Sequence, residues 1–256
     1  MDITAFLGVL LGCGLIIQAI GIEKGIHLFV HPTSFLIVMG GTFGATLVHF
    51  PLTQLFRIGG RLKVIFSPRG RDYLQDIKHM SEIATNYKKN GRLSLEKTVK
   101  KTQDHYLKHG LQLLIDNIPV KELVPILEKN IDFIQSRHNQ GIHFFEQMAQ
   151  YAPGFGFIGT LIGLINLLSE LESPETIGPN MAIALITTFY GILLANLIFQ
   201  PLSGRLRIAS NEELIQKKML LEGIICIAQK ETNYMIYEKM SMCLPEKERK
   251  KLKPNK

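Results

Sequence analysis

Four long stretches without a charged residue constrain this chain more than any other feature of its sequence. A helix needs about 20 consecutive apolar residues to cross the hydrocarbon core of a bilayer. The uncharged stretches cover residues 3–22, 25–56, 147–169 and 176–204. Each can hold one span, and we place the spans at residues 3–22, 33–50, 152–169 and 180–203. The sequence therefore predicts an all-α membrane protein with four transmembrane helices.

The charged residues gather in two of the segments outside these spans. Residues 51–150 contain 16 Lys and Arg against 10 Asp and Glu, and residues 205–256 contain 12 against 7. The connection between spans one and two has only Glu23 and Lys24, and the connection between spans three and four has glutamates and no base. Cytoplasmic segments of membrane proteins are enriched in Lys and Arg. We therefore expect both basic segments and both termini on the cytoplasmic side.

Outside the spans, apolar residues recur at steps of three and four residues, the spacing of one helix face. One such face consists of Tyr73, Ile77, Met80, Ala84 and Tyr87. Residues 205–243 have the pattern of one long helix with a polar face, and the charged tail from Pro245 is predicted to be disordered. The predicted domains are a transmembrane hairpin at 1–50, a helical cytoplasmic domain at 51–150, a second transmembrane hairpin at 151–204, and a cytoplasmic helix with a basic tail at 205–256.

No Asp, Glu, Lys or Arg lies within the four spans as we place them. Ion pathways through membranes usually depend on an ionisable group inside the bilayer. Either this chain moves no ions, or another subunit supplies the carboxylate. The absence of a carboxylate makes a partner helix the central question about function.

Three threonines stand near the middle of spans three and four: Thr160 in the third, and Thr187 and Thr188 in the fourth. Threonine in a membrane helix often donates a hydrogen bond to its own backbone four residues earlier, so each threonine could simply fill space. Their similar depth on two adjoining spans indicates instead a row of hydroxyl groups beside an ion pathway. The sequence leaves both interpretations open.

Small residues line one side of the same two spans. They are Gly156, Gly159 and Gly163 in the third span and Gly191 and Ala195 in the fourth. Small side chains four residues apart let two membrane helices approach closely. One interpretation is tight packing within the chain or against a second copy of it. The other is a smooth surface on which a helix of a different protein packs.

Proline residues mark the inner ends of these spans, Pro153 at the start of the third and Pro201 at the end of the fourth. Proline suits the first turn of a helix and tends to end a helix elsewhere, because it lacks a backbone N–H. We therefore expect one helix to begin near Pro153 and another to end near Pro201. The alternative interpretation is a hinge between the membrane part and the inner domain.

Three of the spans resemble a known family. The stretches "YAPGFGFIGTLIGLINLL" and "IGPNMAIALITTFYGILLANLIFQPLSGRL" look like the third and fourth spans of the flagellar stator A-subunits, the MotA/PomA group. The stretch "HPTSFLIVMGGTFGATLVHFP" is similar to the second span of that group. The ExbB/TolQ proteins are a more distant group that shares spans three and four but lacks the N-terminal hairpin. The four-span layout favours the stator family.

The resemblance implies a stator subunit of the bacterial flagellar motor, located in the inner membrane, and not an enzyme. It implies a ring of A-subunits, a pentamer, around a dimer of a B-subunit that carries a peptidoglycan-binding domain. The single membrane helix of the B-subunit contributes an essential aspartate, and passage of a proton or a sodium ion to this aspartate drives rotation. Thr160 and Thr187 would then lie beside the ion path. Pro153 and Pro201 match two prolines of the family.

The resemblance also implies a contact with the rotor switch protein through charged residues of the inner domain. Members of the family commonly have an arginine there and a glutamate eight residues later. This chain has Lys88 and Glu96 at that spacing, with Lys89 beside the first. Lysine makes a point-charge contact and not a bidentate one, so we expect a rotor contact that differs in detail. Without the resemblance, a solvated surface is the favoured interpretation of these three residues, because exposed ion pairs contribute little stability.

Two other functions stay open at this stage. One is an ExbB/TolQ-like energiser of outer-membrane processes, and the other is a passive membrane scaffold with a basic inner domain. Nucleic-acid binding is disfavoured, because the net charge of +7 is spread over helices and a tail without a recognisable binding fold. Cys13, Cys226 and Cys243 form no motif, so we expect no disulfide, no metal site and no cofactor besides the transported ion.

Overall fold

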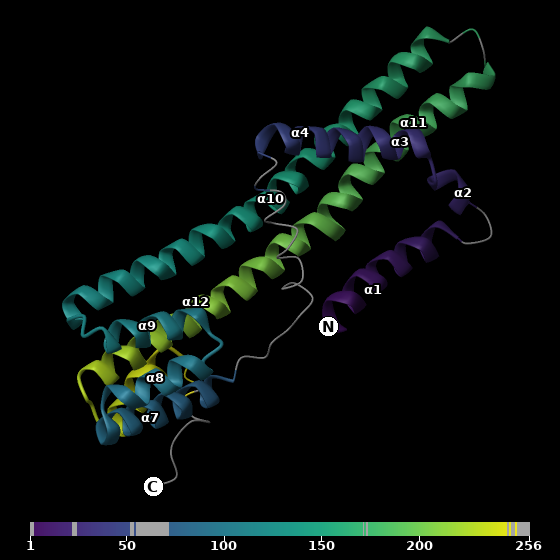
Figure 1. Ribbon diagram of the computed structural model, residues 1–256. Coiled ribbons are helices and arrows are strands. Elements are labelled where there is room, and N and C mark those ends of the chain that lie inside the picture. The colour runs from purple at the N-terminus through teal and green to yellow at the C-terminus, as the bar shows by residue number, and fades with distance from the viewer. Residues whose placement is uncertain are drawn as a thin grey trace. The chain divides into compact units, whose positions relative to one another are not determined.

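The computed structural model describes residues 3–21, 25–51, 54, 72–170, 172, 174–244, 246 and 249. Every regular element within these residues is a helix (Figure 1). The chain divides into two compact units. The first takes the described residues of Met1–Pro68 and Asn139–Ile208, and the second takes those of Arg69–His138 and Ala209–Lys256. The all-helical fold predicted from the sequence is confirmed for the described part of the chain.

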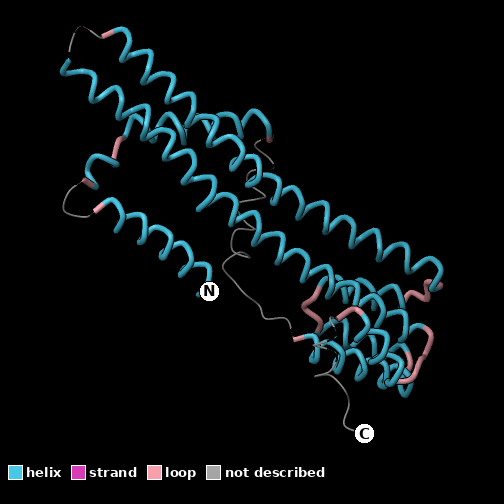
Figure 2. Tube along the Cα trace, turned by 180° about the vertical axis from the view of Figure 1, so that it is seen from behind, coloured by secondary structure: helices cyan, strands magenta, loops and turns pink. Residues whose placement is uncertain are grey.

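The first unit is built around two long antiparallel helices. α10 spans Val120–Ser169 and α11 spans Pro174–Leu193, and the later part of α10 runs beside α11 in both views (Figures 1 and 2). A π-helix, η2 (Leu194–Phe199), follows α11 and leads directly into α12 (Gln200–Ala228).

Shorter helices complete the first unit. They are α1 (Ile3–Ile20), α2 (Ile26–Phe29), α3 (Pro32–Phe35), the π-helix η1 (Leu36–Gly40) and α4 (Gly41–His49). α3 and η1 pack against α11, and α1 contacts η2. The helical segments 3–20 and 32–49 lie where we placed the first two spans, whereas Glu23 and Lys24 of their connection lie outside the described residues.

Among the described residues, two helical runs are long and apolar enough to cross a membrane, judged by length and composition: Val120–Ser169 and Glu175–Ala228. α1 contains a shorter apolar stretch, Leu10–Ile20. Large apolar side chains are exposed along these helices and α4, among them Leu15, Val48, Ile165, Leu168 and Leu185. The full arrangement of four spans stays a prediction.

The expectation that Pro153 begins a helix and that Pro201 ends one is wrong. Pro153 lies well inside α10, and Pro201 is the second residue of α12, which continues η2 without a break. A helical proline clashes with the carbonyl four residues earlier. For Pro201 that carbonyl belongs to Leu197, inside η2, where the wider π-helical turn displaces the carbonyls from the ordinary ladder. Around Pro153, close packing on α11 holds the helix together.

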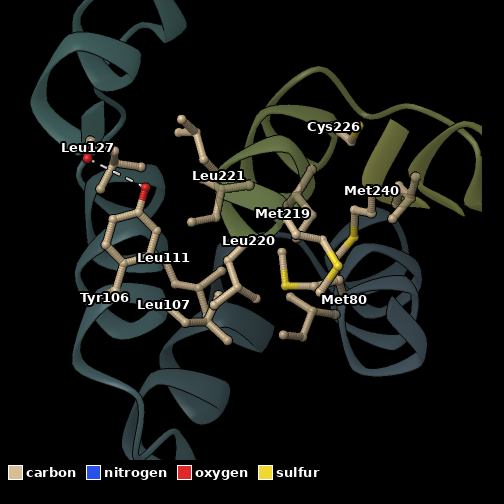
Figure 3. Packing of buried hydrophobic residues seen from close by; sticks show 14 of the residues in the cluster. Met80, Tyr106, Leu107, Leu111, Leu127, Met219, Leu220, Leu221, Cys226 and Met240 are labelled. Atoms are coloured by element: carbon tan, nitrogen blue, oxygen red, sulfur yellow. Dashed lines mark hydrogen bonds between the residues drawn. The ribbon is translucent and has the colours of Figure 1, made fainter. Parts of the chain in front are cut away.

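The second unit is a helical domain with one apolar core (Figure 3). It consists of α7 (Tyr73–Asn90), α8 (Arg92–Lys101), α9 (His105–Ile115), α13 (Asn233–Met242), the first part of α10 and the last part of α12. Met80, Leu111, Leu127 and Met219 come from four of these helices and are fully buried. Ile77, Met80 and Ala84 of the predicted face of α7 are buried in this core, and Tyr73 and Tyr87 are partly buried against it. The prediction of one long helix at residues 205–243 is wrong, because α12 ends at Ala228 and α13 begins at Asn233. The predicted disorder from Pro245 onward lies outside the described residues, apart from 246 and 249.

Candidate functional site

The three threonines of spans three and four converge where α10 and α11 meet. The Thr160 hydroxyl lies 3.0 Å from the Ala184 carbonyl oxygen of α11 and 3.2 Å from the Gly156 carbonyl oxygen of its own helix. It also forms a hydrogen bond with the Thr188 hydroxyl. The Thr188 hydroxyl is 3.4 Å from the same Ala184 oxygen. Thr160 and Thr188 are both only partly buried.

The two hydroxyl groups of Thr160 and Thr188 have fewer hydrogens to donate than they have oxygen atoms within hydrogen-bonding distance. A threonine hydroxyl donates one hydrogen and accepts through two lone pairs. Thr160 Oγ1 faces the oxygens of Thr188, Ala184 and Gly156 and can donate to one of them at a time. The cluster therefore keeps lone pairs available to a cation or to a proton donor.

Thr187 has a different place from the other two threonines. It is completely buried, and its hydroxyl donates within its own helix, 2.9 Å from the Ile183 oxygen and 3.0 Å from the Ala184 oxygen. Its side chain fills the space above Gly159, where an added Cβ would lie 2.5 Å from Thr187 Cβ. Thr187 thus fills space between the helices, and its place in the ion pathway stays a prediction, while Thr160 and Thr188 contact each other across the helix pair.

The predicted small residues bring α10 and α11 into close contact within the chain. A Cβ added at Gly156 would lie 2.9 Å from the Thr187 oxygen, and one at Gly163 would lie 2.7 Å from the Ala184 nitrogen. A Cβ at Gly191 would lie 2.6 Å from the Ala152 oxygen. Ala195 is buried in η2. These contacts correspond to tight packing inside the chain, and a surface for a foreign helix stays a prediction.

The predicted rotor-contact residues lie on the surface of the second unit. Lys88 and Lys89 are in the last turn of α7 and Glu96 is in α8, and all three side chains are exposed. A polar pocket lies between these two helices. It is lined by His79, Asn86, Asn90, Ser94, Lys97, Thr98, Lys101 and Thr102. The sequence did not predict this pocket, because a pocket between helices depends on how they pack.

The sequence also did not predict two polar contacts between helices of the first unit. His49 Nδ1 and the Tyr151 hydroxyl lie 2.7 Å apart, and the Tyr190 hydroxyl donates to the Phe29 carbonyl oxygen. The partners are 102 and 161 residues apart in the chain, so no local pattern joins them. A signal was present only for His49 and Tyr151, which lie at the ends of the second and third predicted spans, because polar aromatic residues favour the membrane interface. Within the described residues, no group of three or more His, Cys, Asp or Glu side chains could hold a metal ion.

The similarity of this chain to known proteins agrees with these features. The profile of the MotA/TolQ/ExbB proton channel family matches residues 98–219. Over 218 residues the chain is 38% identical to uncharacterized protein YtxD of Bacillus subtilis (strain 168), covering 83% of this chain and 80% of that protein. Over 230 residues it is 33% identical to chemotaxis protein PomA of Vibrio alginolyticus, covering 89% of each. The chain belongs to the MotA/TolQ/ExbB proton channel family.

A solved structure extends the family likeness to the N-terminal helices. The chain resembles a chain of the flagellar MotAB stator complex from Bacillus subtilis with a TM-score of 0.88 and 25% identity, over 98% of this chain and 100% of that one. The similarity therefore includes α1 to α4, which precede the residues matched by the family profile. The resemblance to the MotA/PomA group is confirmed.

Proposed function

We propose that this chain is a stator subunit of the bacterial flagellar motor and forms an ion-driven rotary unit with a single-span B-subunit. The observation that carries the proposal is the contact between the Thr160 and Thr188 hydroxyls on the closely packed pair α10 and α11. Similarity to PomA and to a flagellar MotAB stator complex supports it. In this proposal the chain conducts a proton or a sodium ion and is not an enzyme.

The threonine cluster supplies oxygen atoms but no charge. Hydroxyl and carbonyl oxygens can replace part of the hydration shell of a cation, and a hydroxyl can also pass on a proton. A cation inside a bilayer needs a compensating anionic group, and the spans as we place them contain no Asp or Glu. We therefore assign the anionic group to an essential aspartate on the membrane helix of the B-subunit.

The proposed assembly follows the pattern of the family. Spans at 3–22, 33–50, 152–169 and 180–203 cross the bacterial inner membrane, and both termini are cytoplasmic. Copies of the chain, five by family resemblance, form a ring around a B-subunit dimer that is anchored to peptidoglycan. Pro153 and Pro201 act as hinges, since each removes a backbone donor from a helix that belongs to both units.

Torque passes from the second unit to the rotor switch protein in this proposal. The exposure of Lys88, Lys89 and Glu96 supports it, because a charged contact to another protein needs side chains that solvent can reach. The alternative, an energiser of outer-membrane processes like ExbB/TolQ, shares the family profile. Similarity to a flagellar stator structure over 98% of the chain favours the stator.

Replacing Thr160 by valine tests the ion pathway. Valine keeps the shape of threonine and removes the hydroxyl. We expect the driving-ion concentration for half-maximal rotation speed to rise roughly 5- to 150-fold, as for a lost interaction of about 1–3 kcal/mol. The measurement is the rotation of tethered cells that lack other stators and express the variant with its B-subunit, with sodium varied at fixed pH and then pH varied at fixed sodium.

Thr42→Val is the matched control. Thr42 is completely buried, whereas Thr160 is partly buried, and the Thr42 hydroxyl donates to the carbonyl oxygen four residues earlier, as the Thr160 hydroxyl can. Thr42 lies on α4, outside the threonine cluster. We expect its ion dependence to equal that of the unmodified chain. Equal ion dependence in Thr160→Val and Thr42→Val, at equal membrane insertion, would remove the cluster from the pathway.

A further inference from the structure

The chain between α2 and α3 leaves two backbone groups without helical partners. α2 ends at Phe29 and α3 begins at Pro32, so the Phe29 carbonyl and the His31 N–H are not part of a helical hydrogen-bond ladder. The Tyr190 hydroxyl of α11 satisfies both. It donates to the Phe29 oxygen and accepts from the His31 nitrogen at 3.2 Å. One hydroxyl thus fastens the connection between the first two predicted spans to the fourth.

Aromatic rings lie beside the ring of Tyr190. The Tyr190 ring lies 6.1 Å from the rings of both Phe35 and Phe189, measured between centroids. Phe29 in turn packs edge-on against Phe189 at 5.5 Å. Inside a bilayer, as the proposed function requires, unpaired backbone groups are strongly unfavourable, because no water replaces the missing partner. The Tyr190 hydroxyl is therefore the partner that keeps this connection in place.

On α11, Tyr190 lies between the threonine cluster and the contact of Gly191 with α10. It comes two residues after Thr188 and directly before Gly191, which packs against the backbone of Ala152 and Pro153 on α10. Neighbouring helical residues point about 100° apart around the axis. α11 is therefore held by α10 on the side of Gly191 and by the α2–α3 connection on the side of Tyr190. Together the two attachments fix the rotation of α11 about its own axis.

We propose that Tyr190 is a positioning residue for the ion pathway. By holding the α2–α3 connection, its hydroxyl sets the rotation of α11 at which Thr188 meets Thr160. Tyr190 does not contact the ion and acts through these two hydroxyls. The proposal rests on the proposed function for its effect on ion dependence, whereas its effect on the Thr160–Thr188 distance does not depend on that function.

The structural test uses the rate of disulfide formation to report the distance between positions 160 and 188. Thr160→Cys and Thr188→Cys are combined in a chain with Cys13→Ser and Cys243→Ser, while the fully buried Cys226 is kept. Two cysteines form a disulfide only when their Cα atoms come within about 7 Å. With a mild added oxidant, we expect Tyr190→Phe to slow disulfide formation roughly tenfold, as for a shift of about 1.4 kcal/mol. Tyr151→Phe is the control, because that hydroxyl bonds the exposed His49 side chain and no backbone group.

The functional test measures ion dependence for each stator unit, from the speed steps as single units join a motor. We expect Tyr190→Phe to raise the half-saturating ion concentration while the speed at saturating ion is kept, and Tyr151→Phe to change neither. A merely structural role would reduce the number of units that join and leave the ion dependence of each unit unchanged. That result, or unchanged disulfide formation, would overturn the role of Tyr190. If Thr160→Val also leaves ion dependence unchanged, the proposed function itself fails.

Discussion

At the scale of single residues, two aspartates of the second unit have pKa values displaced in opposite directions. Burial raises the pKa of Asp76, and the hydrogen bond from Gln216 offsets this only in part. Burial also acts to raise the pKa of Asp104, but hydrogen bonds from Lys217 and the Leu107 N–H outweigh it and lower the pKa below the usual value. The Asp104–Lys217 ion pair is 2.5 Å long, and only 8% of the lysine side chain is exposed.

Opposite shifts predict opposite effects of the two Asp→Asn changes. Asp104 stabilises the fold above the pKa of an unfolded aspartate, and this contribution is lost as the pH falls through its lower folded pKa. Asp104→Asn should therefore lower the free energy of unfolding at pH 7 by about 1–3 kcal/mol, because Lys217 stays buried without its charged partner. For Asp76 the sign is reversed, since ionisation at neutral pH opposes folding. Asp76→Asn should leave stability unchanged or raise it.

The buried Cys226 thiol provides the measurement. Burial, with a smaller effect of Glu231, raises the pKa of this thiol to about 12, so it reacts with thiol reagents only after unfolding. Labelling is followed against denaturant in the full chain with Cys13→Ser and Cys243→Ser at pH 7, where an unfolded thiol ionises enough to react. Equal losses of stability for the two variants at pH 7 would contradict the assignment of opposite signs.

At the scale of helices, the spacing of apolar residues predicted the buried faces better than the prolines predicted where helices begin and end. The spacing of apolar residues predicted the buried face of α7, because that face follows from which residues lie on one side of a helix. The same spacing did not predict the break between α12 and α13, which interrupts the helix expected at residues 205–243. Pro153 and Pro201 misled, because the tendency of proline to end a helix is local. The packing of α10 on α11 overrides it at Pro153, and the π-helical turn of η2 accommodates Pro201. The sequence predicted that Thr160 and Thr188 lie at a similar depth. It did not predict that they touch, because depth does not fix how each helix is rotated about its axis.

Replacing the two prolines by alanine tests the proposed hinges. Pro153→Ala and Pro201→Ala restore a backbone donor and remove a ring, which should stabilise each helix by up to about 3 kcal/mol. We expect the melting temperature to be kept or raised and the rotation speed to fall, because the stiffer helices bend less. Pro179→Ala is the control, since Pro179 is also inside a helix but lies in α11, away from both hinges. Three variants that rotate at equal speed would argue against hinges.

At the scale of the whole molecule, the two units have different roles in the proposed function, and the predicted spans contain no carboxylate. The first unit brings hydroxyls together on a closely packed helix pair, and the second carries exposed charges on α7 and α8. α10 and α12 each contribute residues to both units. In the proposed function, the ion pathway works only when a partner supplies the anionic group beside the hydroxyls. Rotation should therefore depend on that partner more than on any residue of this chain.

The most direct test is rotation of tethered cells that lack all other stator subunits. The chain is expressed alone, with its B-subunit, and with a B-subunit whose membrane aspartate is replaced by asparagine. The account predicts rotation only for the chain with the intact B-subunit, and a speed that rises with the concentration of one ion, a proton or sodium. Rotation that persists with the asparagine variant, at equal membrane levels of both proteins, would contradict it.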